Sequence, residues 1–266
     1  MILRQRIEAC KRRIAKRLSR QIPDDVSKPM FSASNIKYEL AERTRAIDSG
    51  GIGLIHTLVR EIGLDEAIDS RLHLLQMHLP YHESDHVLNI AYNAMCGGRC
   101  LQDMELRRND VTFLDALGTV RIPDPTTAGD FCRRFVSPYH IDRLQEAIDE
   151  ARLKVWRKQP SGFFDWAVID MDGHLVETTG ECKQGMDIAY DGTWGYHVLV
   201  VSLASTGEVL RLVNRPGNRP SHEGAAAQCD AVIPLCRKGG FRRILLRGDT
   251  DFSQTKHLDR WDEDGV

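Results

Sequence analysis

The chain has 266 residues and a formal net charge of −2 at pH 7. Its hydrophobic fraction of 42% and charged fraction of 28% are typical of a globular protein, and no apolar run approaches the roughly 20 residues of a membrane span. These values exclude an integral membrane protein. The basic amino terminus lacks the apolar core of a secretory signal, so we expect a cytoplasmic protein with no membrane partner.

The sequence pattern changes character near residue 160, and the length allows two domains. We predict a basic amino-terminal arm and linker at residues 1–29, a helical domain at 30–160 and an α/β domain at 161–266. The arm could bind phosphate, but charge runs are usually just solvated, and both interpretations stay open.

Apolar residues recur at helical spacing through the first half of the chain. This spacing predicts a helix that Gly63 ends, and then further helices, at residues 52–62, 64–75, 87–95, 101–108, 111–117, 126–135 and 139–156. Ser84 or Asp85 should cap the third helix, and Thr126 should cap the sixth. The sixth carries Phe131, Arg133 and Arg134, and it is either a DNA-contacting helix or an amphipathic core helix.

The stretch HESDH at 82–86 satisfies the H-E-x-x-H pattern of zinc peptidases. That chemistry needs both imidazoles on one face of a continuous helix. Pro80 lies just upstream, so we expect His82 and His86 to lie on either side of a helix start, which favours a capped turn over a zinc site.

The second half predicts strands and helices in an α/β order. Strands are expected at 166–172, 197–205, 208–214 and 243–247, with helices at 223–237 and from Ser253 to residue 261. Three strands form an antiparallel meander, and a helical crossover then returns the fourth strand parallel to the first and beside it.

Two carboxylates lie at the end of the first strand. Asp170 and Asp172 share one face of it, because successive side chains in a strand point to opposite faces. Neighbouring carboxylates repel one another, so we expect a cation or basic neighbours to neutralise them, and we favour a cation. The parallel fourth strand should bring Asp249 to Asp172. Alternatively, Asp249 and Asp251 only cap the last helix.

At these residues the chain resembles the bacterial insertion-sequence transposases of the DDE type, which have an RNase H-like catalytic domain. The resemblance rests on Gly180, Gln184 and Gly185 and on five longer motifs: IPDPTTAGDFCRRF at 122–135, VIDMDG at 168–173, GYH at 195–197, LVNRPGN at 212–218 and LLRGDTDF at 245–252. It implies an α/β fold in which a helical amino-terminal domain precedes an incomplete RNase H-like mixed sheet with flanking helices.

The resemblance also implies the catalytic acids. Asp172 corresponds to the first acid, with Asp170 as its neighbour and fallback, and Asp249 corresponds to the second. The third acid of the family, a glutamate, has no counterpart, since residues 262–264 are too near in sequence and on the wrong element. We therefore expect a chain truncated before the third acid and a weakly active or inactive polypeptide.

The implied chemistry is metal-dependent cleavage and strand transfer of DNA. Two Mg²⁺ or Mn²⁺ ions are expected, with Asp172 and Asp249 as ligands, because hard cations prefer carboxylate oxygens. The implied partners are double-stranded DNA at transposon ends and target and, on DNA, a second copy in a homodimer. The location would then be the cytoplasm, associated with the nucleoid.

The loop NRPGNRPSH at 214–222 supplies candidate DNA contacts. Its donors suit phosphate groups beside the metals, and the candidates are Arg215, Asn218, Arg219, Ser221 and His222. The alternative is a Pro- and Gly-containing loop with incidental charge. Three other functions stay open: a non-catalytic remnant that binds transposon ends, an RNase H-like nuclease unrelated to transposition, and the zinc peptidase.

Overall fold

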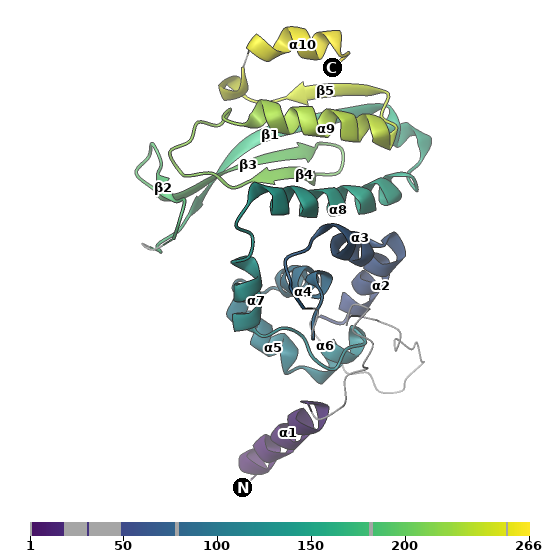
Figure 1. Ribbon diagram of the computed structural model, residues 1–266, viewed down its shortest axis with the longest axis vertical. Helices are drawn as coiled ribbons and strands as arrows, with labels where there is room; N and C mark the ends of the chain where they lie inside the picture. Colours follow the sequence, from purple (N-terminus) through teal and green to yellow (C-terminus); the bar gives the residue numbers. More distant parts are fainter. Residues whose placement is uncertain (1, 19–30, 32–48, 78–79, 181–182, 254) are drawn as a thin grey trace. The chain divides into compact units, whose positions relative to one another are not determined.

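The computed structural model describes all residues except 1, 19–30, 32–48, 78–79, 181–182 and 254 (Figure 1). The chain divides into two compact units, residues 1–151 and 152–266, and each has its own hydrophobic core. The division falls within one long helix, and the predicted boundary near residue 160 stays a prediction. Helix α1 (Ile2–Leu18) occupies most of the predicted arm, whereas the predicted linker lies outside the described residues.

The first unit is helical throughout its described part. After α1 its elements are α2 (Ile52–Ile62), α3 (Leu64–Arg71), α4 (Glu83–Met95), η1 (Leu101–Asp103), α5 (Met104–Arg108), α6 (Val111–Ala116), α7 (Pro125–Cys132) and the first part of α8 (Pro138–Trp156). Gly63 ends α2 as predicted, with a φ of 66° that suits a glycine at a helix end.

Several helix boundaries in this unit differ from the prediction by a few residues, and three have an identifiable cause. Helix α3 ends at Arg71, because the Glu83 carboxylate accepts the N–H groups of Leu74 and Leu75 at 2.9 and 3.0 Å and holds that segment outside the helix. Helix α4 begins after His82, whose N–H donates to Asp85 at 2.9 Å, so neither Ser84 nor Asp85 is the N-cap. The N-cap of α7 is Asp124 and not Thr126, which instead donates its N–H to the Asp124 carboxylate.

Helix α7 is amphipathic. The Phe131 ring is buried, stacked on His86 with ring centroids 4.4 Å apart, whereas Arg133 is exposed and pairs with Asp130 at 2.6 Å. Phe131 therefore belongs to the core, whereas Arg133 and Arg134, directly after the helix, are exposed.

The second unit is a mixed sheet with helices. Its strands are β1 (Trp166–Glu177), β2 (Asp187–Ile188), β3 (Trp194–Leu203), β4 (Glu208–Val213) and β5 (Arg243–Arg247). Its other elements are η2 (Ser161–Phe164), α9 (Ala225–Gly239), η3 (Thr250–Phe252), η4 (Thr255–His257), α10 (Leu258–Glu263) and the end of α8. Strand β1 runs five residues beyond its predicted end, because β3 pairs with it as far as Glu177.

The strand pairing confirms the predicted topology. Strands β1 and β3 are antiparallel, as are β3 and β4, and β5 lies parallel to β1 with Asp170 opposite Arg247. Helix α9 connects β4 to β5 and lies along the sheet (Figure 1). The predicted start of the last helix is wrong: Ser253 does not cap it, because Asp249 takes the Asp251 N–H and turns the chain into η3 directly after β5.

The core of this unit lies on one face of the sheet. Ala167 and Ile169 of β1 pack there with Cys229 and Val232 of α9. Trp156 of α8 is buried in the same cluster, and its Nε1 donates to Glu208 Oε2 at 3.0 Å. No helix among the described residues combines the length and the apolar character that a membrane span requires.

The contact between Trp156 and α9 requires a glycine at position 239. A Cβ atom at this position would overlap with the Trp156 ring. Replacing Gly239 with Ala should therefore lower the free energy of unfolding by about 1–3 kcal/mol, although Ala favours a helix by about 1 kcal/mol over Gly. Urea unfolding measures this change. The matched control is Lys238→Ala on the exposed side of α9, and a G239A protein as stable as K238A would contradict the packing.

Candidate active site

The two carboxylates of β1 have different surroundings. Asp170 forms a two-pronged ion pair with Arg247 of β5, in which Nε donates to Oδ1 at 2.6 Å and an Nη donates to Oδ2 at 2.8 Å. This pair raises the pKa of the Arg247 guanidinium. Asp172 lies two residues further along the same face of β1 and is exposed. A basic neighbour therefore neutralises Asp170, where the sequence favoured a cation.

Asp249 lies at the same end of the sheet. The parallel ladder between β1 and β5 stops at Asp170 and Arg247, and Asp172 and Asp249 each follow that pair by two residues. Asp249 is exposed, and its Oδ1 accepts the N–H of Asp251 at 2.9 Å, which caps η3. The capping role considered from the sequence is present, and it concerns the short turn η3 rather than the last helix.

Asp170 and Asp172 lie on the face of the sheet that turns away from α9. Ala167 and Ile169 alternate with Asp170 along β1 and are fully buried against α9. The opposite face carries large apolar side chains that are about half exposed, at 45% for Trp166 and 46% for Leu245. Asp170 and Asp172 consequently project from an open face.

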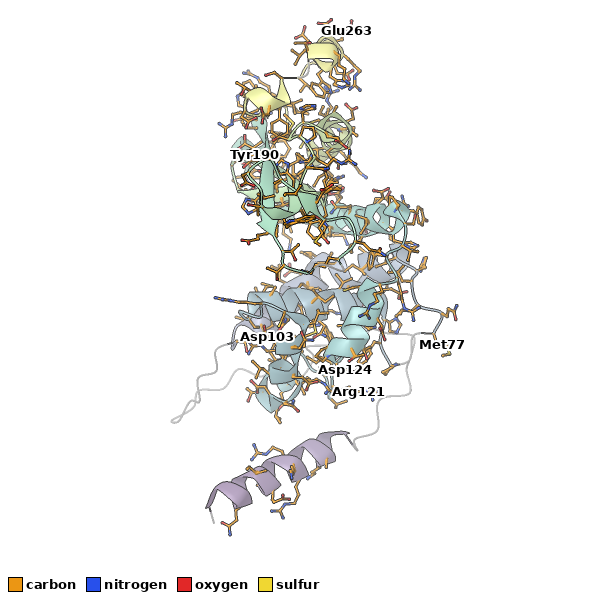
Figure 2. The ribbon with its side chains drawn as sticks, turned by 90° about the vertical axis from the view of Figure 1, so that its left-hand side faces the viewer. Met77, Asp103, Arg121, Asp124, Tyr190 and Glu263 are labelled. Atoms are coloured by element: carbon orange, nitrogen blue, oxygen red, sulfur yellow. The ribbon has the colours of Figure 1, made fainter. Side chains whose placement is uncertain are left out.

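A pocket of about 310 Å³ lies beside Gly173, on the other face of β1. His197, Arg219, Ser221 and Asp251 line it, and Ser221 Oγ donates to Asp251 Oδ2 at 3.4 Å. We call it the loop pocket. Tyr190, which precedes β3, also lines it and is fully exposed (Figure 2).

Gly173 is the point where β1 meets the loop pocket. A Cβ at this position would lie 2.5 Å from His197 Nε2 and 3.2 Å from Ser221 Oγ. His197 Nδ1 lies 2.6 Å from the Arg219 carbonyl oxygen, and because a carbonyl only accepts, Nδ1 carries the hydrogen. Glycine at 173 therefore allows the loop and β1 to approach closely. Its neighbour Asp172 points to the opposite face.

Two further motif glycines also sit where backbones approach. A Cβ at Gly195 would overlap with the Val176 carbonyl on β1, and one at Gly217 would lie 2.5 Å from the Asp187 carbonyl oxygen. The glycine of GYH thus allows β3 to approach β1, and the second glycine motif, LVNRPGN, lets the loop lie against β2 and β3.

Arg215 makes its hydrogen bonds within the protein, whereas the sequence led us to expect a contact with phosphate. Its side chain is buried, with 7% of the residue exposed, and its guanidinium donates to the carbonyl oxygens of His197, Pro220, Ser221 and Glu223. Burial lowers the pKa of this guanidinium. Arg215 therefore holds the loop onto β3.

The other candidate loop residues line the loop pocket. Asn218 Nδ2 donates to Asp187 Oδ2 at 2.6 Å, and the half-exposed Arg219 lies 3.4 Å from Glu223. Ser221 and His222 are partly buried at its wall. The structure therefore brings Asn218, Arg219, Ser221 and His222 together, on the face opposite Asp172.

Two members of the site do not emerge from the sequence reasoning. Arg247 is not among the predicted site residues, although its place two residues before Asp249 puts it opposite Asp170 in a parallel register. Asp251 is expected as a helix cap, whereas its carboxylate accepts from Ser221 in the loop pocket. A register argument can find Arg247, but the Asp251 contact depends on how η3 turns.

The HESDH stretch forms a helix start in the first unit. His82 is the N-cap of α4, His86 stacks on Phe131, and the carboxylate of Glu83 accepts two backbone N–H groups. Asp85 accepts from the Phe31 N–H at 3.2 Å. These side chains stabilise the helix end, as a capped turn does.

Asp172 of β1 and Asp249 after β5 are the residues best suited to a metal ion. Among the described residues, no group of three or more His, Cys, Asp or Glu side chains is placed to hold one. Asp172 and Asp249 are exposed carboxylates, and each lies two residues beyond the parallel pairing of β1 with β5. Mg²⁺ is commonly held by one or two carboxylates together with water and substrate phosphates, so this pair fits such an ion.

A mixed sheet with acids just beyond the pairing of two adjacent parallel strands defines a candidate catalytic α/β domain. Comparison with known families agrees with this class: the model of the transposase DDE domain group 1 matches residues 33–266. The chain belongs to this family of transposase domains, which implies a DNA substrate. No curated protein and no solved structure matches the chain.

The contacts of Arg215 predict a structural role that Arg219 does not share. Replacing Arg215 with Ala removes a buried side chain that donates to four carbonyl groups and should lower the free energy of unfolding by about 2–4 kcal/mol. Replacing Arg219, which is about half exposed, should change it by less than about 0.5 kcal/mol. Urea unfolding of both variants checks this. Equal stabilities of R215A and R219A would overturn the structural assignment.

His86 predicts a pH dependence of stability in the helical unit. Burial is the main reason that its pKa falls from 6.5 to about 4. The charge of Glu83 raises this pKa by a smaller amount, and the charge of Arg134 lowers it further. Below pH 6.5 the unfolded chain binds a proton that the folded chain excludes. The stabilisation that the neutral His86 ring contributes to the fold is therefore fully present above pH 6.5, and it is lost as the pH falls toward about 4.

Replacing His86 with Phe should remove this part of the pH dependence, which amounts to at most about 3 kcal/mol. Unfolding free energies measured at a series of pH values check it. The control is His73→Gln, since His73 is exposed. An H86F protein with the same pH slope as the wild type and H73Q would contradict the prediction.

Proposed function

We propose that this chain carries the catalytic acids of a DNA transposase, which cleaves a phosphodiester bond and joins the freed strand to target DNA. The observation that supports the proposal is the parallel pairing of β5 with β1, in a chain of the DDE family: Asp172 within β1 and Asp249 after β5 each lie two residues beyond the last pair of that ladder. Asp172 is the first acid and Asp249 the second.

Asp170 has a different part in this proposal. Both of its oxygens already accept from Arg247, so a cation would have to compete with a guanidinium that is always charged. Asp170 and Arg247 instead join β1 to β5 at the last pair of their parallel ladder. This pairing favours Asp172 over Asp170 as the metal ligand.

Asp172 and Asp249 would hold the Mg²⁺ or Mn²⁺ that the family uses. Such an ion, when bound, supplies positive charge beside the attacking and leaving oxygens of a phosphodiester. The residues of the chain contribute oxygen ligands on an open face of the sheet, which a DNA strand can approach. Asp249 keeps one oxygen on the Asp251 N–H, which fixes the orientation of its carboxylate.

The loop pocket is proposed to contact the DNA backbone through Asn218, Arg219, Ser221 and His222. The ion pair of Arg219 with Glu223 is exposed on both sides, at 48% and 47%, and such pairs contribute little to stability. Arg219 can therefore leave Glu223 and bind a phosphate group at little cost in free energy. The DNA would bind as a duplex at transposon ends and target, to two copies of the chain as a homodimer.

Two substitutions test the acids. Asp172→Asn and Asp249→Asn should each weaken Mn²⁺ binding by at least about tenfold, because each removes a charged oxygen ligand. Electron paramagnetic resonance of free Mn²⁺ measures this independently of turnover. Any Mg²⁺-dependent nicking of plasmid DNA by the wild type should fall by about a hundredfold.

Asp259→Asn, on the exposed surface of α10, is the matched control and should behave as the wild type. Mn²⁺ binding that is unchanged in both D172N and D249N would overturn the assignment of the acids. Transfer of a labelled strand into the plasmid would distinguish a transposase from a nuclease, which only hydrolyses. DNA binding without metal-dependent cleavage would favour the non-catalytic remnant.

A further inference from the structure

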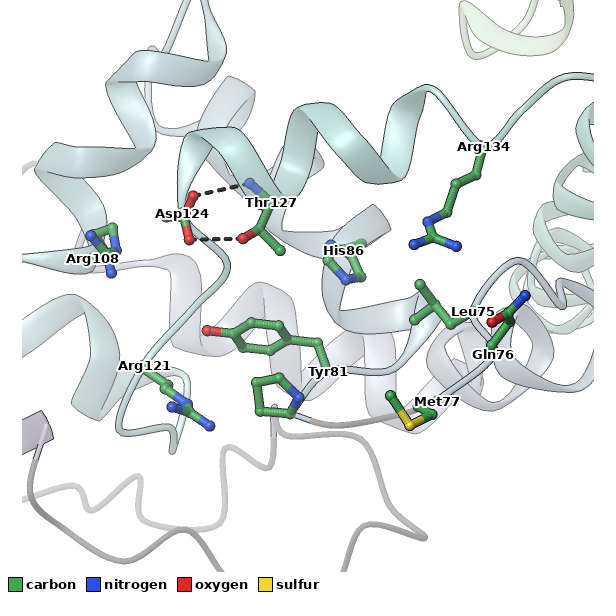
Figure 3. Close-up of a pocket in the computed structure, with 11 residues that line it drawn as sticks. Leu75, Gln76, Met77, Tyr81, His86, Arg108, Arg121, Asp124, Thr127 and Arg134 are labelled. Carbon is green, nitrogen blue, oxygen red and sulfur yellow. Dashed lines mark hydrogen bonds between the residues drawn. The ribbon is translucent and has the colours of Figure 1, made fainter.

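A second pocket, of about 540 Å³, lies within the helical unit and is lined by elements that are far apart in sequence (Figure 3). Leu75 and Tyr81 come from the connection between α3 and α4, and His86 comes from α4. The remaining wall includes Arg108, Arg121, Asp124, Thr127 and Arg134. We call it the arginine pocket. None of these residues belongs to the candidate active site.

Three guanidinium groups border the arginine pocket. Arg121 lies over the Tyr81 ring at 5.7 Å, and its buried Nε has no hydrogen-bond partner. Arg134 is exposed and donates to the Leu74 carbonyl at 3.3 Å. Arg108 pairs with Glu105 at 3.0 Å on the surface of α5. Three arginines around one cavity favour an anionic ligand.

The acid at the arginine pocket does not cancel this charge. The Asp124 carboxylate accepts the N–H and the hydroxyl of Thr127 at 3.0 and 2.8 Å (Figure 3). It also accepts the N–H of Thr126 at 2.9 Å. These bonds cap α7 and hold the pKa of Asp124 low. Glu105 pairs with Arg108, so this one carboxylate, engaged in a cap, stands against Arg121 and Arg134.

A buried residue in the wall of the arginine pocket carries a polar atom without a hydrogen-bond partner among the described residues. His86 is only 4% exposed, and its Nδ1 has no hydrogen bond. The ring is fixed by stacking on Phe131 and by an edge contact with Tyr81 at 5.6 Å. Buried polar atoms are normally paired, so an unpaired nitrogen in a pocket wall indicates a ligand that carries a donor or acceptor.

The remaining wall is aromatic and apolar. Tyr81 and Leu75 contribute carbon surface, and the volume lies in the range of pockets that enclose small organic molecules. A bare phosphate would leave most of this space unfilled. A base, in contrast, can stack on an aromatic ring beside a cationic groove, as in proteins that bind single-stranded nucleic acid.

We propose that the arginine pocket binds a nucleotide, with the phosphate held by Arg108, Arg121 and Arg134 and the base against Tyr81 and His86. The nucleotide is either free or part of an unpaired DNA strand, and the chemistry of recognition is the same. The site lies in the helical unit and functions whether or not Asp172 and Asp249 bind metal.

Calorimetric titration of the full chain, without divalent metal, tests the proposal. The mononucleotide dAMP should bind at least about tenfold more tightly than deoxyadenosine, which lacks the phosphate, and than inorganic phosphate, which lacks the base. A dAMP affinity equal to that of deoxyadenosine, or no binding of dAMP, would overturn it.

A matched pair of variants locates the binding. Arg134→Gln should weaken dAMP binding by about tenfold, whereas Arg133→Gln, which removes the adjacent exposed arginine outside the pocket, should leave it unchanged. Both side chains are exposed, so both variants should fold. Arg121→Gln should show the same loss as R134Q. Equal effects of R133Q and R134Q would mean non-specific attraction and would refute the site.

Competition between dAMP and single-stranded DNA shows which source the nucleotide has. This experiment uses a D172N/D249N protein, which lacks the proposed catalytic acids. If dAMP competes with a short single-stranded oligonucleotide and R134Q weakens both, the nucleotide belongs to a DNA strand. If R134Q weakens dAMP alone, the ligand is free. Nucleotide binding that persists while metal-dependent cleavage fails in every assay would contradict only the proposed transposase chemistry.

Discussion

Strand β5 lies beside β1 and runs in the same direction, and a parallel pair of this kind requires a crossover that carries the chain back along the sheet. Helix α9 is that crossover, and its buried face packs on the inner side chains of β1 and β3. The same packing fixes which face of β1 is left open. The position of Asp172 and Asp249 at one end of the sheet is therefore a consequence of α9 and not of local sequence.

The two neighbouring carboxylates of β1, Asp170 and Asp172, have different electrostatic surroundings. Arg247 satisfies both oxygens of Asp170, and Asp172 lies one step further, where no helix covers it. An arrangement of this kind limits like-charge repulsion, since one of two adjacent acids is already neutralised within the protein. It also distinguishes two acids that the motif VIDMDG alone leaves equivalent.

Arginines in this chain act in two settings that composition cannot tell apart. Arg215 is buried and binds four carbonyl groups, so its charge organises the loop pocket without being displayed. Arg134 is exposed beside a cavity, and Arg121 lies half buried over an aromatic ring. The net charge of −2 therefore says little about nucleic-acid binding, because attraction depends on the arginines that border a pocket.

Hydrophobic periodicity and turn residues determined much of the fold: α2, the end of α2 at Gly63, β5 and the meander follow from local spacing, because apolar faces must be buried. The predicted strand order also brings the acids of the first strand near Asp249, but it does not choose between Asp170 and Asp172. Caps were less predictable, since His82 and Asp124 compete with nearby residues that cap equally well. Only the tertiary structure decided that Arg215 is buried, that Asp170 pairs with Arg247 and that the loop residues lie on the face opposite Asp172. These features join residues distant in sequence, and their contacts depend on the register and on which face each helix covers, neither of which local patterns encode.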